Sequence, residues 1–254
     1  MNAPQPRSLA GIATLTVAVI ACAAFGIGFY VLPGTNPQLG LWQRMCRAAG
    51  FVTAPERDSE AAASGLTNVV VPRSALRMGT SDEIGRGATL ALRCTACHGA
   101  QGLSGANAPN LAGQYPEVIY KELLDFQRGA RTDAVMGAMV ATLSDADMLD
   151  LAHYYAFLPR PEKDRTTSMA PALVRVGDPM RNIAPCISCH GAKDGKTGAP
   201  ALEGEPNAYL VDQLNAFAHG SRKNDANSAM RNEARLLTAA EIGLVADHYA
   251  GASQ

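Results

Sequence analysis

The chain has 254 residues, of which 47% are apolar and 18% charged, so it has enough apolar material for folded cores and is not a disordered protein. Its 22 basic and 23 acidic residues nearly cancel, which argues against a nucleic-acid partner because there is no basic excess to neutralise phosphates. Six cysteines, four of them in two Cys-x-x-Cys pairs, are the most informative part of the composition.

The first element predicted along the chain is a membrane-spanning helix within residues 1–34. Residues 9–32 form an uncharged run that would be about 36 Å long as a helix, enough to cross a hydrocarbon core of roughly 30 Å. Arg7 precedes this run, which predicts a cytoplasmic N-terminus, with the rest of the chain on the periplasmic side of a bacterial inner membrane. A cleaved signal peptide and lipid modification of Cys22 are the alternatives. The apolar run continues well past Cys22 and favours a retained single-pass anchor.

Residues 35–79 are expected to connect this anchor to the body of the protein. Residues 54–64 are small and polar, which is typical of a flexible tether. Apolar residues at helical spacing precede them and predict either a short helix at the membrane surface or a docking element for a membrane partner. These residues are Trp42, Met45, Cys46 and Ala49. We expect no core residue before Ser81.

An internal repeat organises the rest of the chain. CTACHG begins at Cys94 and CISCHG at Cys186, an offset of 92. The segments PNLAGQ, FQRGAR and LSDAD then recur as PALEGE, FAHGSR and LTAAE, with offsets of 91 to 94. The repeat predicts two similar domains, residues 80–160 and 168–254, with Pro159-Arg160-Pro161 at the joint between them.

Helices are predicted in both domains, and no segment alternates for long like a strand, so the expected fold class is all-α. In the first domain, Ser81 is expected to cap a helix that leads to Cys94. Two further helices are expected at 117–128, ended by Gly129, and from Ser144 to Phe157. In the second domain, helices are expected at 209–218 and from Thr238 to Tyr249. Pro179 and Pro185 predict a short or broken lead helix there.

The two Cys-x-x-Cys-His motifs indicate covalently bound c-type haem. The thiols of Cys94 and Cys97 can reach the two vinyl groups of one porphyrin, and His98 can offer its imidazole to the iron. The same triplet recurs as Cys186, Cys189 and His190. Disulfides or a shared zinc site would leave the histidines without a role, and a thioredoxin-like redox pair would need a βαβ pattern. We therefore predict two covalently bound haems.

The second axial ligand of each iron is expected to be a methionine. Met136 lies seven residues before LSDAD, and Met230 lies seven residues before LTAAE. Met139 has no methionine at the corresponding position of the second half. The repeat therefore favours Met136 and Met230, with Met139 as the alternative in the first half.

Two further matched pairs are expected near the haems. Pro109 and Pro200 follow the ligand histidines by eleven and ten residues, and their carbonyls are predicted to accept the histidine Nδ1–H. The alternative is that they are ordinary turn prolines. Arg131 and Arg222 close matched helices and could either pair with haem propionates or be solvated cations at helix ends.

With these motifs, residues 80–250 resemble the c4-type dihaem cytochromes c. The resemblance rests on CTACHG and CISCHG, PNLAGQ and PALEGE, FQRGAR and FAHGSR, and the two methionine positions. It implies two class I cytochrome c domains whose haems face each other across the domain interface, with ligation by His98 and Met136 and by His190 and Met230. Members of that family are usually soluble or peripherally attached, whereas an anchor is expected here.

The function implied is that of an electron carrier and not an enzyme, with no small-molecule substrate. The expected route runs from a quinol-oxidising complex to a haem–copper terminal oxidase, with the chain acting either as a free carrier or as a bound subunit. An electron-exit subunit of a periplasmic dehydrogenase is the alternative. A dihaem peroxidase is a further one, but a matched methionine in both halves argues against the open iron site it would need.

Overall fold

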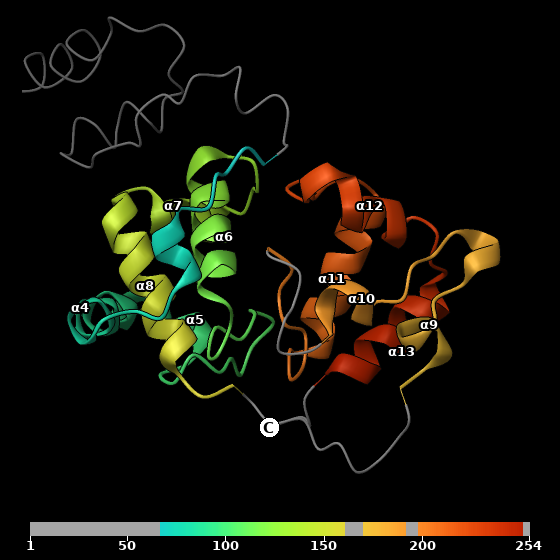
Figure 1. The fold of residues 1–254 in the computed structure, drawn as a ribbon, viewed down its shortest axis with the longest axis horizontal. Coiled ribbons are helices and arrows are strands. Elements are labelled where there is room, and N and C mark those ends of the chain that lie inside the picture. Colours follow the sequence, from blue (N-terminus) through green and yellow to red (C-terminus); the bar gives the residue numbers. More distant parts are fainter. Residues whose placement is uncertain (1–66, 161–169, 192–197, 251–254) are drawn as a thin grey trace, which may run out of the picture. The chain divides into compact units, whose positions relative to one another are not determined.

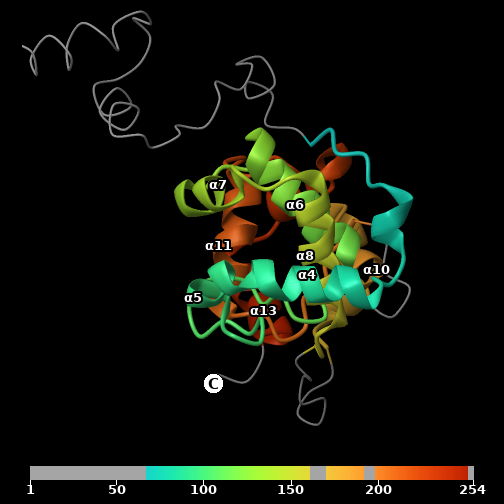
Figure 2. The same cartoon turned by 90° about the vertical axis from the view of Figure 1, so that its left-hand side faces the viewer.

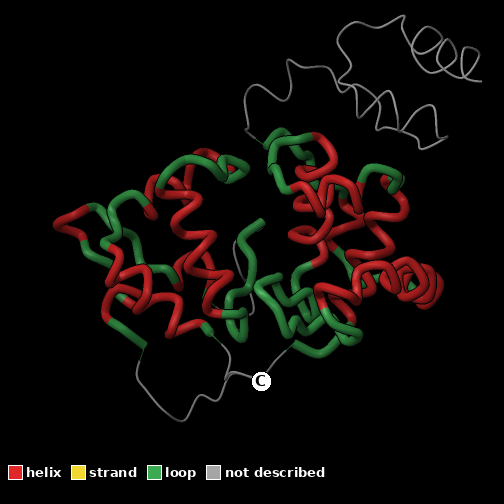
Figure 3. Tube along the Cα trace, turned by 180° about the vertical axis from the view of Figure 1, so that it is seen from behind, coloured by secondary structure: helices red, strands yellow, loops and turns green. Residues whose placement is uncertain are grey.

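The computed structural model describes residues 67–160, 170–191 and 198–250. All of them belong to one compact unit, Glu56–Gln254. Their regular structure is helical, with the helices joined by long loops (Figure 3), so the all-α prediction is confirmed for this part of the chain. The expected anchor at 1–34, the apolar stretch at 42–49 and the tether at 54–64 lie outside the described residues.

The predicted location, a single-pass protein of the bacterial inner membrane, is contradicted. Within the described ranges, no helix is both long enough and apolar enough to cross a bilayer. The longest helices there have 13 residues, whereas a span needs about 20. Residues 9–32, on which the prediction rested, are not among those described.

The first helical group, residues 67–160, is built around α8. Its elements are η1 (Arg73–Leu76), α4 (Ser81–Ala91), η2 (Leu92–Cys94), α5 (Thr95–His98), α6 (Pro116–Arg128), α7 (Ala134–Val140) and α8 (Asp145–Phe157) (Figure 1). Both α4 and α6 pack against α8. Figure 1 shows α4 end-on and Figure 2 shows it lengthwise, crossing in front of α8.

The helix ends of this group follow local chemistry. Ser144 caps the start of α8, as the sequence predicts, and forms a capping box with Asp147. Helix α6 ends where Gly129 adopts a left-handed conformation with φ of 76°, which glycine adopts without steric cost. The cap of α4 was predicted one residue too late: Thr80, not Ser81, accepts the Glu83 N–H, and Glu83 in return accepts the Thr80 N–H.

The core of the first group extends further toward the N-terminus than the sequence indicates. Its fully buried residues include Met148, Leu151 and Ala152 of α8 and Leu124 of α6. Ala75 of η1 is also fully buried in this cluster, and two preceding valines pack against it. The expectation that no core residue precedes Ser81 is therefore wrong, because residues 69–75 cover the α6–α8 face.

The second helical group, residues 170–250, has the same order of α-helices as the first from the haem-binding turn onward. Its lead helix is shorter. Its elements are α9 (Ala172–Arg175), η3 (Pro179–Arg181), α10 (Ile187–His190), α11 (Asn207–Ala218), η4 (Ala226–Ser228), α12 (Ala229–Ala234) and α13 (Ala239–Tyr249). The predicted short, broken lead helix is confirmed by α9 and η3. Thr238 caps α13, as expected, and forms a capping box with Glu241.

The core of the second group is small. Its buried cluster joins α9, α11 and α13 and consists of Val174, Leu210, Val245, Ala246 and Tyr249. Helix α11 packs against both α12 and α13. The second Cys-x-x-Cys-His motif lies at α10, between η3 and α11 in the chain.

Candidate functional site

Each Cys-x-x-Cys-His motif is held in one short helical turn. Cys94 ends η2, and the four residues of α5 carry Cys97 and His98, while α10 carries Cys189 and His190 directly after Cys186. None of the four cysteines forms a disulfide. Within the described ranges, no cluster of three or more His, Cys, Asp or Glu side chains could hold a metal ion, so a shared zinc site has no ligand set there. All four thiols are therefore free to attach to a porphyrin.

The two histidines are oriented in the same way. Nδ1 of His98 lies 2.8 Å from the carbonyl oxygen of Pro109, and Nδ1 of His190 lies 2.8 Å from that of Pro200. A carbonyl can only accept, so Nδ1 donates in both pairs and Nε2 is the unprotonated nitrogen. Burial lowers the pKa of His98 and of His190, which favours the neutral ring. Both rings are thus prepared to offer Nε2 to an iron.

Two buried tyrosines lie beside the first cysteine of each motif. Tyr155 in α8 and Tyr249 in α13 occupy corresponding positions of the repeat, 94 residues apart, and are almost fully buried. In the described structure the Tyr249 hydroxyl has no hydrogen-bond partner, and the Tyr155 hydroxyl faces only the weakly bonding Cys94 thiol. Burial raises the pKa of both phenols. A buried hydroxyl without a good partner costs about 1–3 kcal/mol, which fits a site that receives a further group.

The two predicted methionine ligands lie in the first turns of short helices in the two groups. Met136 lies in the first turn of α7, where Asp133 Oδ1 accepts the backbone N–H of Val135 and of Met136, each at 2.9 Å. It is half-buried against the first core. Met139 lies one turn further along the same helix, so ligation by Met136 stays a prediction.

Met230 is the second residue of α12, which directly follows a constrained stretch of backbone. Asn227 and Ser228 both have left-handed φ values, 55° and 59°, which non-glycine residues rarely adopt. The Asp225 carboxylate fixes the next turn by accepting the Arg231 N–H at 2.9 Å and the Arg231 side chain at 2.7 Å. An aspartate therefore orders the helix start that carries the methionine in both groups.

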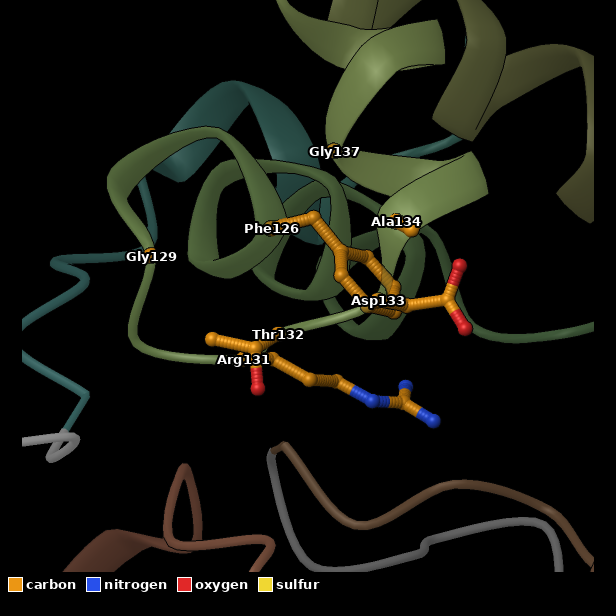
Figure 4. A pocket seen from close by; sticks show the side chains of 7 residues that line it. All are labelled: Phe126, Gly129, Arg131, Thr132, Asp133, Ala134 and Gly137. Atoms are coloured by element: carbon orange, nitrogen blue, oxygen red, sulfur yellow. The ribbon is translucent and has the colours of Figure 1, made fainter. Parts of the chain in front are cut away.

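A cavity of about 470 Å³ lies between the end of α6 and the start of α7 (Figure 4). Its lining residues are Phe126, Gly129, Arg131, Thr132, Asp133, Ala134 and Gly137. Figure 4 shows the Phe126 ring and the Arg131 side chain on its walls. The cavity adjoins the turn of α7 that carries Met136, so it lies on the methionine side of the first candidate site.

One expectation was that Arg131 and Arg222 are solvated cations at helix ends. The structure shows instead that both are largely buried. Each guanidinium lies over a phenylalanine ring of its own group, at 4.6 Å and 4.5 Å, and each side chain is only 13% exposed. Both contact Glu122 Oε2, Arg131 at 2.6 Å and Arg222 at 3.1 Å, and both donate to Gln213 Oε1 at 2.8 Å. The two arginines therefore join the two groups. Pairing with propionates stays a prediction.

This charged cluster continues along α6. Lys121 contacts the fully buried Asp125 at 2.6 Å, and Asn224 of the second group donates to the same carboxylate at 2.8 Å. Burial by itself would raise the pKa of Glu122, but Arg222, Arg131 and Lys121 together hold it well below its ordinary value. Sequence reasoning missed these α6 residues, because their importance depends on partners about 100 positions away.

Sequence reasoning also missed Gln114 and Glu205, the last residues of PNLAGQ and PALEGE. Both are buried, at 6% and 5% exposure. Each forms a hydrogen bond with the loop of the opposite group, Gln114 with Ala201 and Glu205 with Asn110. The signal that could have found them was present in the sequence, because they occupy matching positions of the repeat.

Known proteins match both the sequence and the fold. Residues 84–156 match the family model for cytochrome c. A thiosulfate dehydrogenase electron acceptor from Stutzerimonas stutzeri is 36% identical over 65% of this chain and 81% of its own. A cytochrome c4 from Thiocapsa roseopersicina is 37% identical over 63% of this chain and 88% of its own.

Two solved structures are similar to this one. Reduced cytochrome c4 from Pseudomonas stutzeri has a TM-score of 0.61 and 29% identity, and the match covers 66% of this chain and 97% of that chain. Thiosulfate dehydrogenase from Marichromatium purpuratum has a TM-score of 0.59 and 30% identity, and the match covers 66% of this chain and 40% of that longer chain.

Proposed function

Because this chain belongs to the cytochrome c4-like dihaem cytochromes c, we propose that it accepts electrons from a dehydrogenase that oxidises thiosulfate. The family membership establishes the coarser statement: the chain is an electron-transfer protein with covalently bound c-type haem, and it is a carrier and not an enzyme. The identity of the donor and the residues that hold each haem belong to the proposal.

One haem is assigned to each helical group. Cys94 and Cys97 would bind the first haem, with His98 and Met136 as axial ligands. The residues assigned to the second are Cys186, Cys189, His190 and Met230. We extend the first domain to residues 67–160, from the 80–160 expected from the sequence, because residues 69–75 pack in the same core. The second domain is kept at 168–254.

The chain's own residues supply orientation and environment for this chemistry. When bound, haem supplies reversible one-electron oxidation and reduction. The Pro109 and Pro200 carbonyls fix the ring planes and tautomers of the two histidines. Asp133 and Asp225 order the backbone around the two methionines. The charged cluster at Glu122 holds the two groups together, so that the two redox sites keep a fixed relation.

The donor proposal rests mainly on one observation. A relative that is named an electron acceptor of thiosulfate dehydrogenase is 36% identical to this chain, and the match covers 81% of that relative's length. The thiosulfate dehydrogenase structure supports it, because the region that matches this chain makes up 40% of that longer chain. A carrier that receives electrons directly from such an enzyme needs no small-molecule site of its own.

The test is reduction of the purified holoprotein by a thiosulfate dehydrogenase and thiosulfate, followed by stopped-flow absorption of the haems. We expect reduction that depends on thiosulfate and is faster than that of a single-haem cytochrome c from an unrelated family. Reduction by ascorbate serves as the control that both haems are accessible and active. If ascorbate reduces the protein and the dehydrogenase does not, the donor proposal is wrong.

The second candidate is the route that the family resemblance implies, from a quinol-oxidising complex to a haem–copper oxidase. Its support is the match to cytochrome c4, which covers 97% of that chain. The same stopped-flow experiment with a quinol-oxidising complex as donor compares the two candidates directly. The donor with the higher second-order rate constant is the preferred one.

A further inference from the structure

The peptide between Pro109 and Asn110 has a polar partner at each end. Its carbonyl oxygen accepts the Nδ1–H of His98 at 2.8 Å. Its N–H, which belongs to Asn110, donates to Glu205 Oε2 at 2.9 Å. Glu205 lies in the second helical group and His98 in the first. One peptide unit therefore connects a carboxyl group of one domain to the haem-binding histidine of the other.

The same arrangement runs in the opposite direction. The Pro200 carbonyl accepts the Nδ1–H of His190 at 2.8 Å, and the N–H of the same peptide, on Ala201, donates to Gln114 Oε1 at 3.0 Å. Two further bonds hold the loops in place: Gln114 Nε2 donates to the Ala201 carbonyl at 3.0 Å, and Asn110 Nδ2 donates to the Gly204 carbonyl at 2.7 Å. Each domain thus holds the histidine-binding peptide of the other.

The two connections differ in one respect, the chemistry of the terminal side chain. Gln114 is a neutral amide, whereas Glu205 is a carboxyl group that can ionise. Burial raises the pKa of Glu205 to about 8, and the Asn110 N–H and the positive charge of Arg160 oppose that shift. The segment on the other side of Glu205 is the end of α13, where Ala250 pairs with it through its backbone. Arg160 is the charged group that acts on Glu205 from the described residues around it.

We propose that Gln114 and Glu205 are reciprocal positioning residues for the two haems, and that Glu205 makes the haem held by His98 respond to pH while the haem held by His190 does not. The proposal rests on the proposed ligation by these two histidines. A carboxylate on the N–H side polarises the Pro109–Asn110 peptide and makes its carbonyl a stronger acceptor. The His98 ring then gains negative character and favours the oxidised iron.

Electron and proton are coupled through this connection. Reduction adds one electron, supplied by the donor protein or by a chemical mediator, and removes positive charge near Glu205. The carboxylate then binds a proton from solvent more readily, and oxidation releases that proton again. Each tenfold change in the proton affinity of Glu205 between the two redox states corresponds to about 59 mV in the potential of a one-electron couple.

The test is a spectroelectrochemical titration of the full-length holoprotein on both sides of pH 8, with chemical mediators and no dehydrogenase. In the wild-type protein we expect one haem wave to move to lower potential as the pH rises and the other to stay constant. Glu205→Gln keeps a hydrogen-bond acceptor and should abolish this dependence. Gln114→Glu is the matched variant and should make the other wave depend on pH.

Several results would overturn the proposal. One is a Glu205→Gln protein with both haems low-spin and an unchanged pH dependence; another is that both variants move the same wave. Glu205→Gln adds no charge to the interface, so it decides the question even where Gln114→Glu does not fold. A wrong donor assignment leaves this titration unaffected, because mediators supply the electrons. A wrong ligand assignment shows separately, as a His98→Ala protein that keeps both low-spin spectra.

Discussion

The two helical groups hold their haem-binding turns in the same way but are built on different scaffolds. In the first, the eleven-residue α4 packs along α8, and twelve buried residues form the core cluster. In the second, the lead helix is reduced to the four-residue α9 and a 3-10 turn, and five buried residues form the cluster. Even so, both histidines donate to a proline carbonyl at 2.8 Å. The lead helix is therefore not what orients the histidine.

The difference between the cores bears on stability. Buried apolar area contributes about 25 cal/mol per Å², so a cluster of five buried residues provides less stabilisation than one of twelve. Each core also contains a buried tyrosine hydroxyl without a good hydrogen-bond partner, Tyr155 in the first and Tyr249 in the second, so this cost is common to both. A large apolar group attached at Cys186 and Cys189 would add the buried apolar area that the smaller core lacks. We therefore expect the second group to depend on its haem more than the first does.

Removing the attachment cysteines tests this comparison most strongly. The double variant Cys186→Ala with Cys189→Ala should lose one haem and much of the helical structure of the second group. Cys94→Ala with Cys97→Ala should lose the other haem but keep more helix, because the larger core remains. Intact mass gives the haem count, and circular dichroism gives the helix content. Equal losses in the two double variants would contradict the expected difference.

Replacing the methionines separates the two iron sites. Met136→Ala and Met230→Ala should each keep both haems attached and make one of them high-spin, because the sixth ligand is lost. The measurement is the absorption spectrum of the oxidised protein. Met139→Ala is the control, since Met139 lies one turn along the same helix and should leave the spectrum low-spin. If Met139→Ala gives the high-spin form and Met136→Ala does not, the first-site assignment is reversed.

Glu122→Ala tests the contact between the groups. It leaves Arg131 and Arg222 facing each other without their shared carboxylate, and losing one partner of a buried pair costs about 3–5 kcal/mol. Denaturant unfolding gives this loss, and the exposed Asp212→Ala on α11 should change little. Equal effects of the two substitutions would show that the cluster adds nothing to stability.

The same carboxylate predicts a dependence on pH. The folded-state pKa of Glu122 lies below its ordinary value of 4.5, so its contribution is complete above that value and is lost as the pH falls further. The wild-type protein should therefore lose stability on acidification more steeply than Glu122→Gln, which cannot titrate at this position. Parallel stability curves for the two proteins below pH 4.5 would contradict this assignment.

A pair of glycines in α4 probes the scaffold that only the first group has. A Cβ on Gly87 would lie 2.1 Å from the Asp150 carbonyl oxygen, so Gly87→Ala should force α4 away from α8 and cost about 1–3 kcal/mol. A Cβ on the exposed Gly85 would meet nothing within 4 Å, so Gly85→Ala should stabilise by about 0.5–1 kcal/mol. Thermal unfolding measures both, and opposite signs are the expected result.

Local chemistry accounts for what the sequence predicted correctly. The capping boxes at Ser144 and Thr238 and the left-handed Gly129 lie within a few residues of the helix ends they define. The histidine–proline contacts were also predicted, because the repeat places a stiff proline at nearly the same distance from each motif.

The features that the sequence did not reveal depend on distant partners. Ala75 is buried against α6 and α8, which begin only at Pro116 and Asp145. Arg131 could be recognised as a matched position but not as a partner of Glu122 and Gln213, since no periodicity links these residues. The charge difference between Gln114 and Glu205 is visible in the two aligned motifs. Its consequence for the two histidines becomes visible only in the structure, where each side chain bonds to the peptide of the opposite group.

The crossed hydrogen bonds at Asn110 and Gln114 also bear on how the two-domain chain arose. A single half carries both sides of the contact: a peptide N–H that donates and, four residues later, an amide that accepts. Self-complementary surfaces of this kind are the signature of two-fold symmetric homodimers. The interface thus has the form of a contact between two identical single-haem subunits whose genes later fused. Fusion would have freed each copy to change alone, and an amide on one side with a carboxyl on the other is the kind of asymmetry that identical subunits could never acquire.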